Sequence, residues 1–488
     1  MWHTYHQPTT LSDALTLLAQ YGAEARIIAG GTDLIIELER GVRHQQVLID
    51  ITRVPGLDSI TLDEAAGEIS LGPLVTHADV TASTLLVERA FPLARACWEV
   101  GALQIRNRGT VAGNLITASP ANDTITPLWA LDGAVTLSSQ ARGDRRLPFD
   151  QFFRGVRRTA LEPDELLTAI HLRALPTSSR GTFIKLGLRR AQAISLVNVA
   201  VVLDFDDTLV TGARITLGSV APTIVRAMDA EASLVGQPLS DQAIIDAAAL
   251  AVQAAHPIDD VRASADYRAS MVGVLVQRAL RQLRAGTERD GWPAKPVLLQ
   301  SANLSSLNAQ PHPPITDHRS PITFLINGQP TTLERAAGKT LLRALREDAH
   351  VTGVKEGCAE GECGACTVWL DGEAVMACLV PAERAAGCEV VTVEGLAQHD
   401  GSRYASEGYS TGELHPVQAA FVSEGGVQCG YCTPGLIMSA AKLLEECPDP
   451  GVADIQQALA GNLCRCTGYA KVIAAIQKVA EDDHARSR

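Results

Sequence analysis

Hydrophobic positions in the first 290 residues follow two different periods, which predicts a mixture of helices and strands. Residues 11–20 place apolar side chains on one face of a helix, with Thr10 or Ser12 as the N-cap. Short apolar runs bounded by turn residues predict strands at 25–29, 46–51, 68–72, 134–138 and 197–205. Longer periodic segments predict helices at 83–100, 241–255 and 267–284. We therefore expect an α+β arrangement in this part of the chain.

A change of composition separates these residues from the rest. Residues 298–321 are rich in Ser, Asn and Pro and have no hydrophobic period, which is typical of an interdomain linker. Strand-forming runs at 322–326 and 329–333 flank Asn327-Gly328 and predict a β-hairpin. A helix is expected at 340–348, and from His415 onward the pattern is all-helical, in segments 417–422, 435–444, 452–463 and 469–479.

Length and charge narrow the classes of function. A chain of 488 residues corresponds to about three to four domains. The net charge of 42 − 55 = −13 argues against binding nucleic acid or an anionic membrane, because both need a basic surface. No apolar run reaches the length of about 18 residues that spans a bilayer, and the N-terminus lacks the pattern of a secretory signal. We expect a cytoplasmic protein.

Ten of the 11 cysteines lie between Cys358 and Cys466, and a reducing cytosol does not maintain structural disulfides. The first four follow the spacing C-x4-C-x2-C and then eleven residues before the last, which is the plant-type arrangement for a [2Fe–2S] cluster. These candidate ligands are Cys358, Cys363, Cys366 and Cys378. Glycines among them allow the backbone N–H groups to point at the sulfurs. A zinc site or separate core cysteines are the alternatives.

A second set has the spacing C-x2-C, thirty-one residues, C-x-C, and consists of Cys429, Cys432, Cys464 and Cys466. Each pair precedes an expected helix, with Thr433-Pro434 after one pair and Thr467-Gly468 after the other. The two threonines are the expected N-caps, and Pro434 suits a first helical turn. The positive end of a helix stabilises thiolates and an anionic cluster. On spacing alone zinc competes with iron and sulfide here, but the neighbouring ferredoxin-type loop favours a second [2Fe–2S] cluster.

Three segments resemble the two-cluster iron–sulfur unit of the molybdenum hydroxylases, the family of xanthine dehydrogenase, aldehyde oxidase and aerobic CO dehydrogenase. They are GCAEGECGACTVWLDG at 357–372, QCGYCTPG at 428–435 and GNLCRCTGY at 461–469. The resemblance implies a β-grasp ferredoxin-like domain for the first cluster and a four-helix domain for the second. It also implies that Gln428 contacts the molybdopterin of a partner, although a hydrogen-bonding role at the start of a helix stays open.

Two glycine-containing segments of the N-terminal part suggest a dinucleotide site. A strand enters a Gly-Gly turn at Gly30-Gly31, where glycine lets a diphosphate approach the backbone N–H groups. Alone, such a turn is weak evidence, and it is not the G-x-G-x-x-G fingerprint. The second segment, residues 104–123, is long and polar, which usually means a ligand or a surface.

Together the two segments resemble the FAD domain of the same family, which has the vanillyl-alcohol-oxidase type of fold. The resemblance places FAD contacts at Ile27, Ile28, Ala29, Gly30, Gly31, Thr32, Asp33, Leu34, Thr110, Gly113, Asn114, Thr117, Asp123, Leu166, Phe183 and Lys185. The family commonly has Gly-Gly-Asn where this chain has Ala112-Gly113-Asn114, so the carry-over is weaker at position 112.

The expected fold class is therefore an α+β multidomain protein. The expected domains are an FAD-binding domain at 1–175, a C-terminal subdomain of the flavoprotein module at 176–292, a linker at 293–320, a ferredoxin-like [2Fe–2S] domain at 321–398 and a helical [2Fe–2S] domain at 410–488. Flavin precedes the clusters, whereas single-chain members of the family have the clusters first.

The resemblance implies an electron-transfer subunit with FAD and two [2Fe–2S] clusters, while molybdopterin and the hydroxylated substrate belong to a large partner subunit. We therefore expect a hetero-oligomer and assign no catalytic residue to this chain. Purines, other N-heterocycles, aldehydes and CO stay open as substrates, and NAD+, O2 or a quinone as acceptor. Two alternatives remain: a stand-alone NADH-dependent flavin and iron–sulfur reductase, and a zinc-containing interaction module on a flavoprotein.

Overall fold

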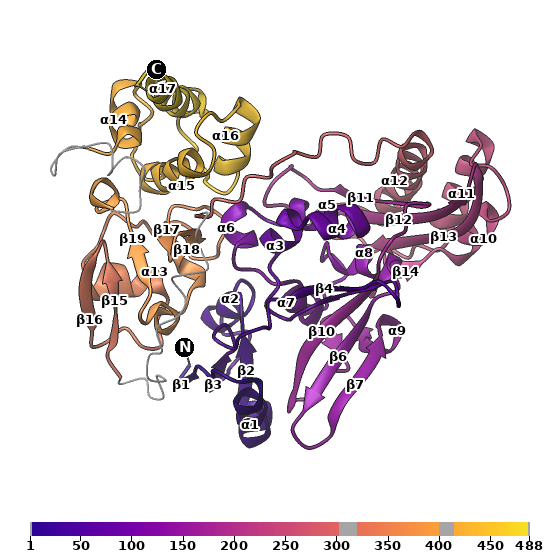
Figure 1. Cartoon of the computed structure of the whole chain (residues 1–488), viewed down its shortest axis with the longest axis horizontal. Helices are drawn as coiled ribbons and strands as arrows, with labels where there is room; N and C mark the ends of the chain where they lie inside the picture. Colours follow the sequence, from indigo (N-terminus) through magenta and orange to yellow (C-terminus); the bar gives the residue numbers. More distant parts are fainter. Residues whose placement is uncertain (1, 302–319, 400–413, 487–488) are drawn as a thin grey trace.

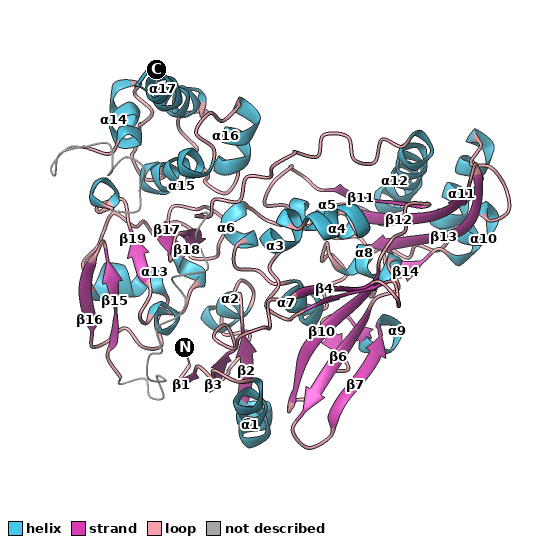
Figure 2. Cartoon of the chain, in the orientation of Figure 1, coloured by secondary structure: helices cyan, strands magenta, loops and turns pink. Residues whose placement is uncertain are grey.

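The structure is a computed structural model that describes residues 2–301, 320–399 and 414–486. The elements of the first 135 residues lie in the middle of an elongated molecule, with the two C-terminal parts at one end and α10–α12 at the other (Figure 1). Helices and strands are mixed throughout, and the last part is helical (Figure 2). The expected mixture of helix and sheet in several domains is confirmed.

The chain begins with a parallel sheet in the order β1-β3-β2, formed by β1 (Thr4–His6), β3 (Val47–Asp50) and β2 (Ala25–Ile28). The predicted first helix is α1 (Leu11–Tyr21), and Thr10 caps it by accepting from the N–H of Asp13. After β2 the chain turns at Gly30-Gly31 into α2 (Leu34–Glu39). The strand, turn and helix therefore follow each other as the sequence predicts.

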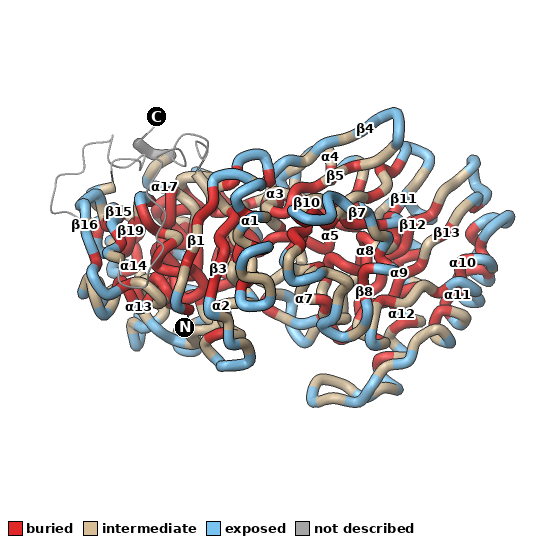
Figure 3. The backbone as a smooth tube through the Cα atoms, turned by 90° about the horizontal axis from the view of Figure 1, so that it is seen from below, coloured by how far each residue is buried: buried red, intermediate tan, exposed pale blue. Residues whose placement is uncertain are grey.

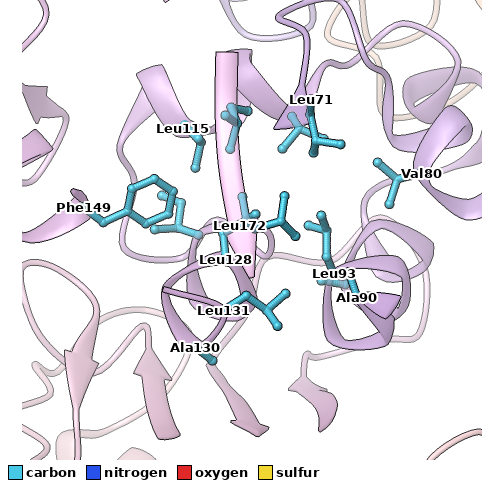
Figure 4. Packing of buried hydrophobic residues seen from close by; sticks show 14 of the residues in the cluster. Leu71, Val80, Ala90, Leu93, Leu115, Leu128, Ala130, Leu131, Phe149 and Leu172 are labelled. Atoms are coloured by element: carbon cyan, nitrogen blue, oxygen red, sulfur yellow. The ribbon is translucent and has the colours of Figure 1, made fainter. Parts of the chain in front are cut away.

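An antiparallel sheet follows in the order β4-β5-β10-β6-β7, with β4 (Ile60–Asp63), β5 (Glu68–Leu71), β10 (Glu165–Arg173), β6 (Ala134–Ser139) and β7 (Gly143–Pro148). Short elements surround it: α3 (His77–Ala82), α6 (Leu103–Arg106), α7 (Val111–Thr117), α8 (Ile125–Ala130), α9 (Phe149–Phe152), β8 (Phe153–Gly155) and β9 (Arg158–Thr159). Figure 4 shows the core between this sheet and its helices, where Leu71 and Leu172 pack with Leu93 and Leu128.

The helix expected at 83–100 is broken into α4 (Thr84–Arg89) and α5 (Phe91–Glu99). Ala90 between them has φ −148° and ψ 41°, and Pro92 lies in the first turn of α5, where its missing N–H costs nothing. The apolar pattern of the two helices is continuous, so periodicity alone did not indicate the break.

A third, antiparallel sheet contains β11 (Ser179–Leu186), β12 (Val197–Asp206), β13 (Leu209–Gly218) and β14 (Val225–Arg226). Three helices accompany it: α10 (Met228–Leu234), α11 (Asp241–Gln253) and α12 (Ala265–Ala285). Strand β12 is buried on both faces, which the burial-coloured tube of Figure 3 shows in red. Val199 and Val201 pack with the helices, whereas Ala200 and Val202 belong to the core of the preceding domain.

The predicted hairpin is β15 (Ile322–Ile326) and β16 (Gln329–Leu333), and both turn residues, Asn327 and Gly328, have positive φ. It belongs to a mixed sheet in the order β16-β15-β19-β17-β18, with β17 (Thr367–Leu370), β18 (Glu373–Met376) and β19 (Glu389–Val391). The helix expected at 340–348 is α13 (Leu341–Arg343) followed by a π-helical segment at 344–348.

Helices of the last part are α14 (Pro416–Ser423), α15 (Thr433–Glu446), α16 (Val452–Leu459) and α17 (Ala470–Arg486). Helix α16 ends before the predicted boundary, and residues 460–469 form the loop that carries Cys464 and Cys466. These helices share a core with Trp369 of β17 and with Leu103 of α6. The N-terminal part, the part that contains β15–β19 and the helical part therefore pack directly against one another.

Candidate functional site

A cavity of about 680 Å³ lies where the end of β2 meets α7 and a loop of the C-terminal part. Its size falls in the range of small-molecule sites. Residues 27–34 line it, together with Thr110, Gly113, Asn114, Thr117, Asp123 and Leu166. The structure thus brings both glycine-containing segments of the sequence to one cavity.

The Gly30-Gly31 turn is packed so closely that only glycine fits. A Cβ atom at Gly30 would lie 2.2 Å from the carbonyl oxygen of Arg108, and one at Gly31 would lie 2.9 Å from that of Leu379. Gly31 also has φ +77°, which favours glycine. A turn without side chains lets an anionic ligand reach the backbone N–H groups, so these residues fit a diphosphate.

The second segment is held in place by hydrogen bonds of its own polar side chains. Thr110 accepts from the N–H of Gly113 at 3.0 Å and caps α7. Asn114 accepts a hydrogen bond from the hydroxyl of Thr124. The departure from the family pattern at Ala112 is accommodated, because this residue is 3% exposed and packs in the hydrophobic core.

Asp123 forms a buried ion pair at the edge of the cavity. Its Oδ2 lies 2.6 Å from Nζ of Lys185 on β11, and its Oδ1 accepts from the hydroxyl of Ser195 at 2.6 Å. Burial raises the pKa of Asp123 from its ordinary value, although Lys185 and Ser195 act in the opposite direction. Among the described residues Asp123 lines the cavity, whereas Lys185 lies behind it and outside the lining.

The remaining predicted flavin contacts differ in position. Leu166 is 2% exposed and lines the cavity. Phe183 pairs with Ala200 across β11 and β12 and packs in the core of the FAD-binding part, outside the described lining. Gln428 is exposed in the helical part, beside Cys429.

Several lining residues were missed by the sequence reasoning, among them Val100, Gln192, Ile194 and residues 360–362. Gln192 has φ +53°, and its Nε2 donates to the carbonyl of Glu362 at 3.3 Å. Residues 360–362 lie between the first two cysteines of the ferredoxin-type motif, so this loop forms one wall of the cavity. No local pattern indicates a contact between segments so far apart in the sequence.

The first four cysteines form two pairs of neighbouring thiols, Cys358 with Cys363 and Cys366 with Cys378. The thiol of Cys363 and the N–H groups of Glu360 and Glu362 hydrogen-bond to Cys358 and lower its pKa to about 5. The loop therefore directs backbone donors at a sulfur, as a thiolate requires.

The second four cysteines are paired in the same way, Cys432 with Cys464 and Cys429 with Cys466, whose sulfurs lie 3.6 Å apart. Cys432 is itself the N-cap of α15, one residue before the expected Thr433. The hydroxyl of Thr467 lies 3.1 Å from the sulfur of Cys464 rather than capping a helix.

Each set of four cysteines therefore forms two pairs of thiols. This matches the donors of a di-iron cluster, in which each iron takes two thiolates. Within the described residues, no group of three or more His, Cys, Asp and Glu side chains forms a site for one metal ion. The paired arrangement of both cysteine sets therefore fits [2Fe–2S] clusters.

The two cysteine loops contact each other directly. The N–H of Leu463 donates to the carbonyl of Cys363 at 2.9 Å, and Asn462 donates to the carbonyl of Gly364 at 2.9 Å. Cys429 and Cys466 are exposed at the surface of the helical part. The thiol sites thus extend from the surface of the molecule to the wall of the flavin cavity.

Three cysteines lie outside both sets. Cys97 and Cys388 are buried, and Cys447 packs partly buried against the core of the helical part. Their positions suit cysteines that act as small hydrophobic side chains. In the described ranges, no helix combines the length and the apolar character needed to cross a membrane.

Four family descriptions match consecutive parts of the chain. Residues 2–175 match "FAD binding domain in molybdopterin dehydrogenase" and residues 182–283 match "CO dehydrogenase flavoprotein C-terminal domain". Residues 324–395 match "2Fe-2S iron-sulfur cluster binding domain" and residues 392–477 match "[2Fe-2S] binding domain".

Relatives match either the flavoprotein part or the iron–sulfur part. The carbon monoxide dehydrogenase medium chain of Hydrogenophaga pseudoflava is 32% identical over 276 residues, which are 57% of this chain and 95% of that one. The nicotinate dehydrogenase small FeS subunit of Eubacterium barkeri is 43% identical over 160 residues, 33% of this chain and 94% of that one. A solved structure of the Hydrogenophaga pseudoflava enzyme covers 58% of this chain and 98% of its own, with a TM-score of 0.56 and 32% identity.

Proposed function

We propose an electron-transfer path for this chain, which belongs to the molybdenum hydroxylase family as an electron-transfer subunit with FAD and [2Fe–2S] domains. In this proposal the chain carries electrons from a molybdenum centre on a separate large subunit to NAD+ or another soluble acceptor. The complex would be cytoplasmic and of the xanthine dehydrogenase type. In the proposed division of labour the substrate is hydroxylated on the partner, and this chain forms a hetero-oligomer with it. When bound, flavin exchanges two electrons with an acceptor, whereas each [2Fe–2S] cluster accepts one at a time.

The proposed roles of the chain's own residues follow from their places. The eight paired cysteines would hold the clusters, and the turn at Gly30-Gly31 with residues 110–123 would hold the dinucleotide. Asp123 with Lys185 would bind polar groups of the flavin, and Leu166 would cover an apolar part of it. Gln192 would keep the first cysteine loop against the cavity through its bond to Glu362.

One observation carries the proposal. The cysteine sites form a series that begins with the exposed Cys429 and Cys466 and ends at residues 360–362, which line the flavin cavity. A partner that docked on this surface would cover the exposed pair of thiols, and Gln428 stands beside Cys429 there. We therefore propose that the molybdopterin-binding subunit docks here.

The test is to isolate the full chain from its native source under mild conditions and to measure its metals, flavin and partners. We expect one FAD and about four irons per chain, and a larger chain that contains stoichiometric molybdenum. If the chain were isolated alone with a full set of iron and FAD and oxidised NADH rapidly by itself, the stand-alone reductase would replace the proposal. Zinc without iron and sulfide would establish the interaction module instead.

A further inference from the structure

Residues 292–301 leave the flavoprotein part after α12 and run to the iron–sulfur part (Figure 1). They lie between the family matches that end at 283 and begin at 324. The sequence predicts an interdomain linker here because residues 298–321 are polar and aperiodic, and the structure shows residues 295–301 packed against two domains. We call residues 295–301 the strap.

Its starting point is fixed on the flavoprotein part by aromatic packing. The ring of Trp292 lies 5.3 Å from that of Phe91 in an edge-to-face arrangement and 5.5 Å from that of Trp98. Trp292 also packs against the core of the FAD-binding domain. The strap therefore begins at an anchored position.

The strap places two apolar side chains in the iron–sulfur core. Val297 is 6% exposed and Leu299 is fully buried, and both belong to the cluster that includes Trp369 of β17 and Phe421 of α14. Leu299 thus touches a core built by both iron–sulfur domains. A leucine removed from water in this way is a strong contact, worth several times the thermal energy.

Backbone hydrogen bonds fix the strap on both domains. The carboxylate of Glu446, at the end of α15, accepts from the N–H of Leu298 at 2.9 Å and from that of Leu299 at 2.6 Å. On the other side, the N–H of Ala374 in β18 donates to the carbonyl of Leu299 at 3.0 Å. The peptide groups around Leu299 are therefore bonded to the helical and the ferredoxin-like domain at once.

The last strap residue is also held. Ser301 accepts from Nζ of Lys442, a buried cation that lies 3.7 Å from the centre of the Trp369 ring. Ser301 donates to the carbonyl of Gly372 at 3.2 Å. A Cβ atom at Gly372 would lie 2.7 Å from the Ser301 hydroxyl, so this glycine leaves room for the strap.

We propose that residues 295–301 are a built-in docking strap, through which the flavoprotein module binds the two iron–sulfur domains without relying on the peptide connection that follows Ser301. Relatives carry the two halves on separate chains, which match 57% and 33% of this one. A covalent connection only raises the local concentration of the halves, whereas the strap adds contacts that persist when the connection is cut.

The test uses the full chain loaded with FAD and iron, with a specific protease site introduced between residues 302 and 319. After cleavage, the dissociation constant of the two halves is measured by analytical ultracentrifugation on dilution, following flavin and cluster absorbance separately. Leu299→Asp should raise this constant by more than about tenfold, because it places an unpaired charge in the shared core. Val261→Asp makes the same kind of change at a fully exposed valine and should leave the constant unchanged.

A second variant keeps the test decisive if Leu299→Asp fails to take up iron. Glu446→Gln retains the size of the side chain and removes the charge that the two N–H groups bind, so the constant should rise about threefold. Full cluster absorbance in that variant would show that the domains remain folded. Equal dissociation constants for the cleaved wild-type chain and the cleaved Glu446→Gln chain would overturn the proposal.

Discussion

The side-chain amide of Gln104 donates to Oδ1 of Asn462 at 2.9 Å and so joins α6 of the FAD-binding domain to the loop that carries Cys464. The same amide donates to the hydroxyl of Ser439 at 3.0 Å, and Asn462 donates onward to the carbonyl of Gly364. Gln104 and Asn462 are each 1% exposed. One buried hydrogen-bonded group therefore connects all three cofactor-binding parts.

Replacing Gln104 should loosen this connection. Gln104→Leu removes the amide that donates to Ser439 and to Asn462, which leaves the Ser439 hydroxyl as the donor to Oδ1 of Asn462. The loss of two buried hydrogen bonds should cost about 1–3 kcal/mol of stability. Urea denaturation followed through cluster absorbance and flavin fluorescence measures the loss. Gln140→Leu, on the exposed surface, is the matched control, and an equal effect there would contradict the assignment.

Gly31→Ala should weaken FAD binding at least tenfold. Its positive φ costs a non-glycine residue roughly 1–2 kcal/mol, and the new methyl would also lie 2.9 Å from the carbonyl of Leu379. Gly56 has φ +80°, and a methyl group there would meet nothing within 4 Å, so Gly56→Ala carries the conformational cost alone. Fluorescence titration of each flavin-free variant with FAD measures its affinity. Equal affinities for Gly31→Ala and Gly56→Ala would show that the close contact with Leu379 does not affect FAD binding.

Breaking the buried pair of Lys185 and Asp123 should destabilise the flavoprotein part. Lys185→Met leaves a buried carboxylate with Ser195 as its hydroxyl donor, at a cost of about 3–5 kcal/mol in thermal unfolding. The pKa of Asp123, already raised by burial, should rise further, so the variant should lose stability more steeply than the wild type as pH increases. Adding Asp123→Asn should restore part of the loss. If the double variant recovered no thermal stability, the interaction between Lys185 and Asp123 would not be the cause of the loss.

Glu383 should make stability depend on pH. Burial raises the pKa of Glu383 to about 7 from the ordinary 4.5, and its Oε1 accepts from Trp2 and from the N–H of Gly338. The folded chain therefore keeps a proton between pH 4.5 and 7, and the stabilisation present below pH 4.5 is lost as pH rises through 7.

Glu383→Gln keeps the acceptor oxygen but removes the titration. Its stability relative to the wild type should therefore increase by about 3 kcal/mol between pH 4.5 and pH 8. Denaturation midpoints measured across this range check the difference. Glu24→Gln makes the same change at an exposed site, and a shift of similar size there would assign the effect to surface charge instead.

Cys432→Ser should remove the second cluster and leave the first. Iron should fall from about four to about two per chain, and one of two [2Fe–2S] signals should disappear from the EPR spectrum of the reduced protein. Cys447→Ser changes a cysteine outside both sets and should retain all iron. Retention of both signals in Cys432→Ser would show that this thiol is not a ligand.

Local sequence patterns predicted the local features well. The Asn327-Gly328 turn and the cap of α1 by Thr10 both depend on neighbours in the sequence. The turn at Gly30-Gly31 was recognisable for the same reason, since glycine at 31 meets a requirement of its own backbone.

Contacts between distant segments were not predictable in this way. The composition of 298–321 indicated a linker, and only the tertiary structure shows Leu299 in a core. Phe183 was expected at the flavin, but β11 directs it into the core, while Lys185 on the same strand reaches Asp123. The place of Glu362 beside Gln192 likewise depends on the packing of two domains.

The part of the flavin cavity formed by residues 360–362 has a consequence for biogenesis. When the ribosome has completed the FAD-binding domain, this wall has not yet been synthesised, so the nascent flavoprotein half presents an open cleft. The cavity is complete only after residues 360–362 have been synthesised and have packed against the flavoprotein part.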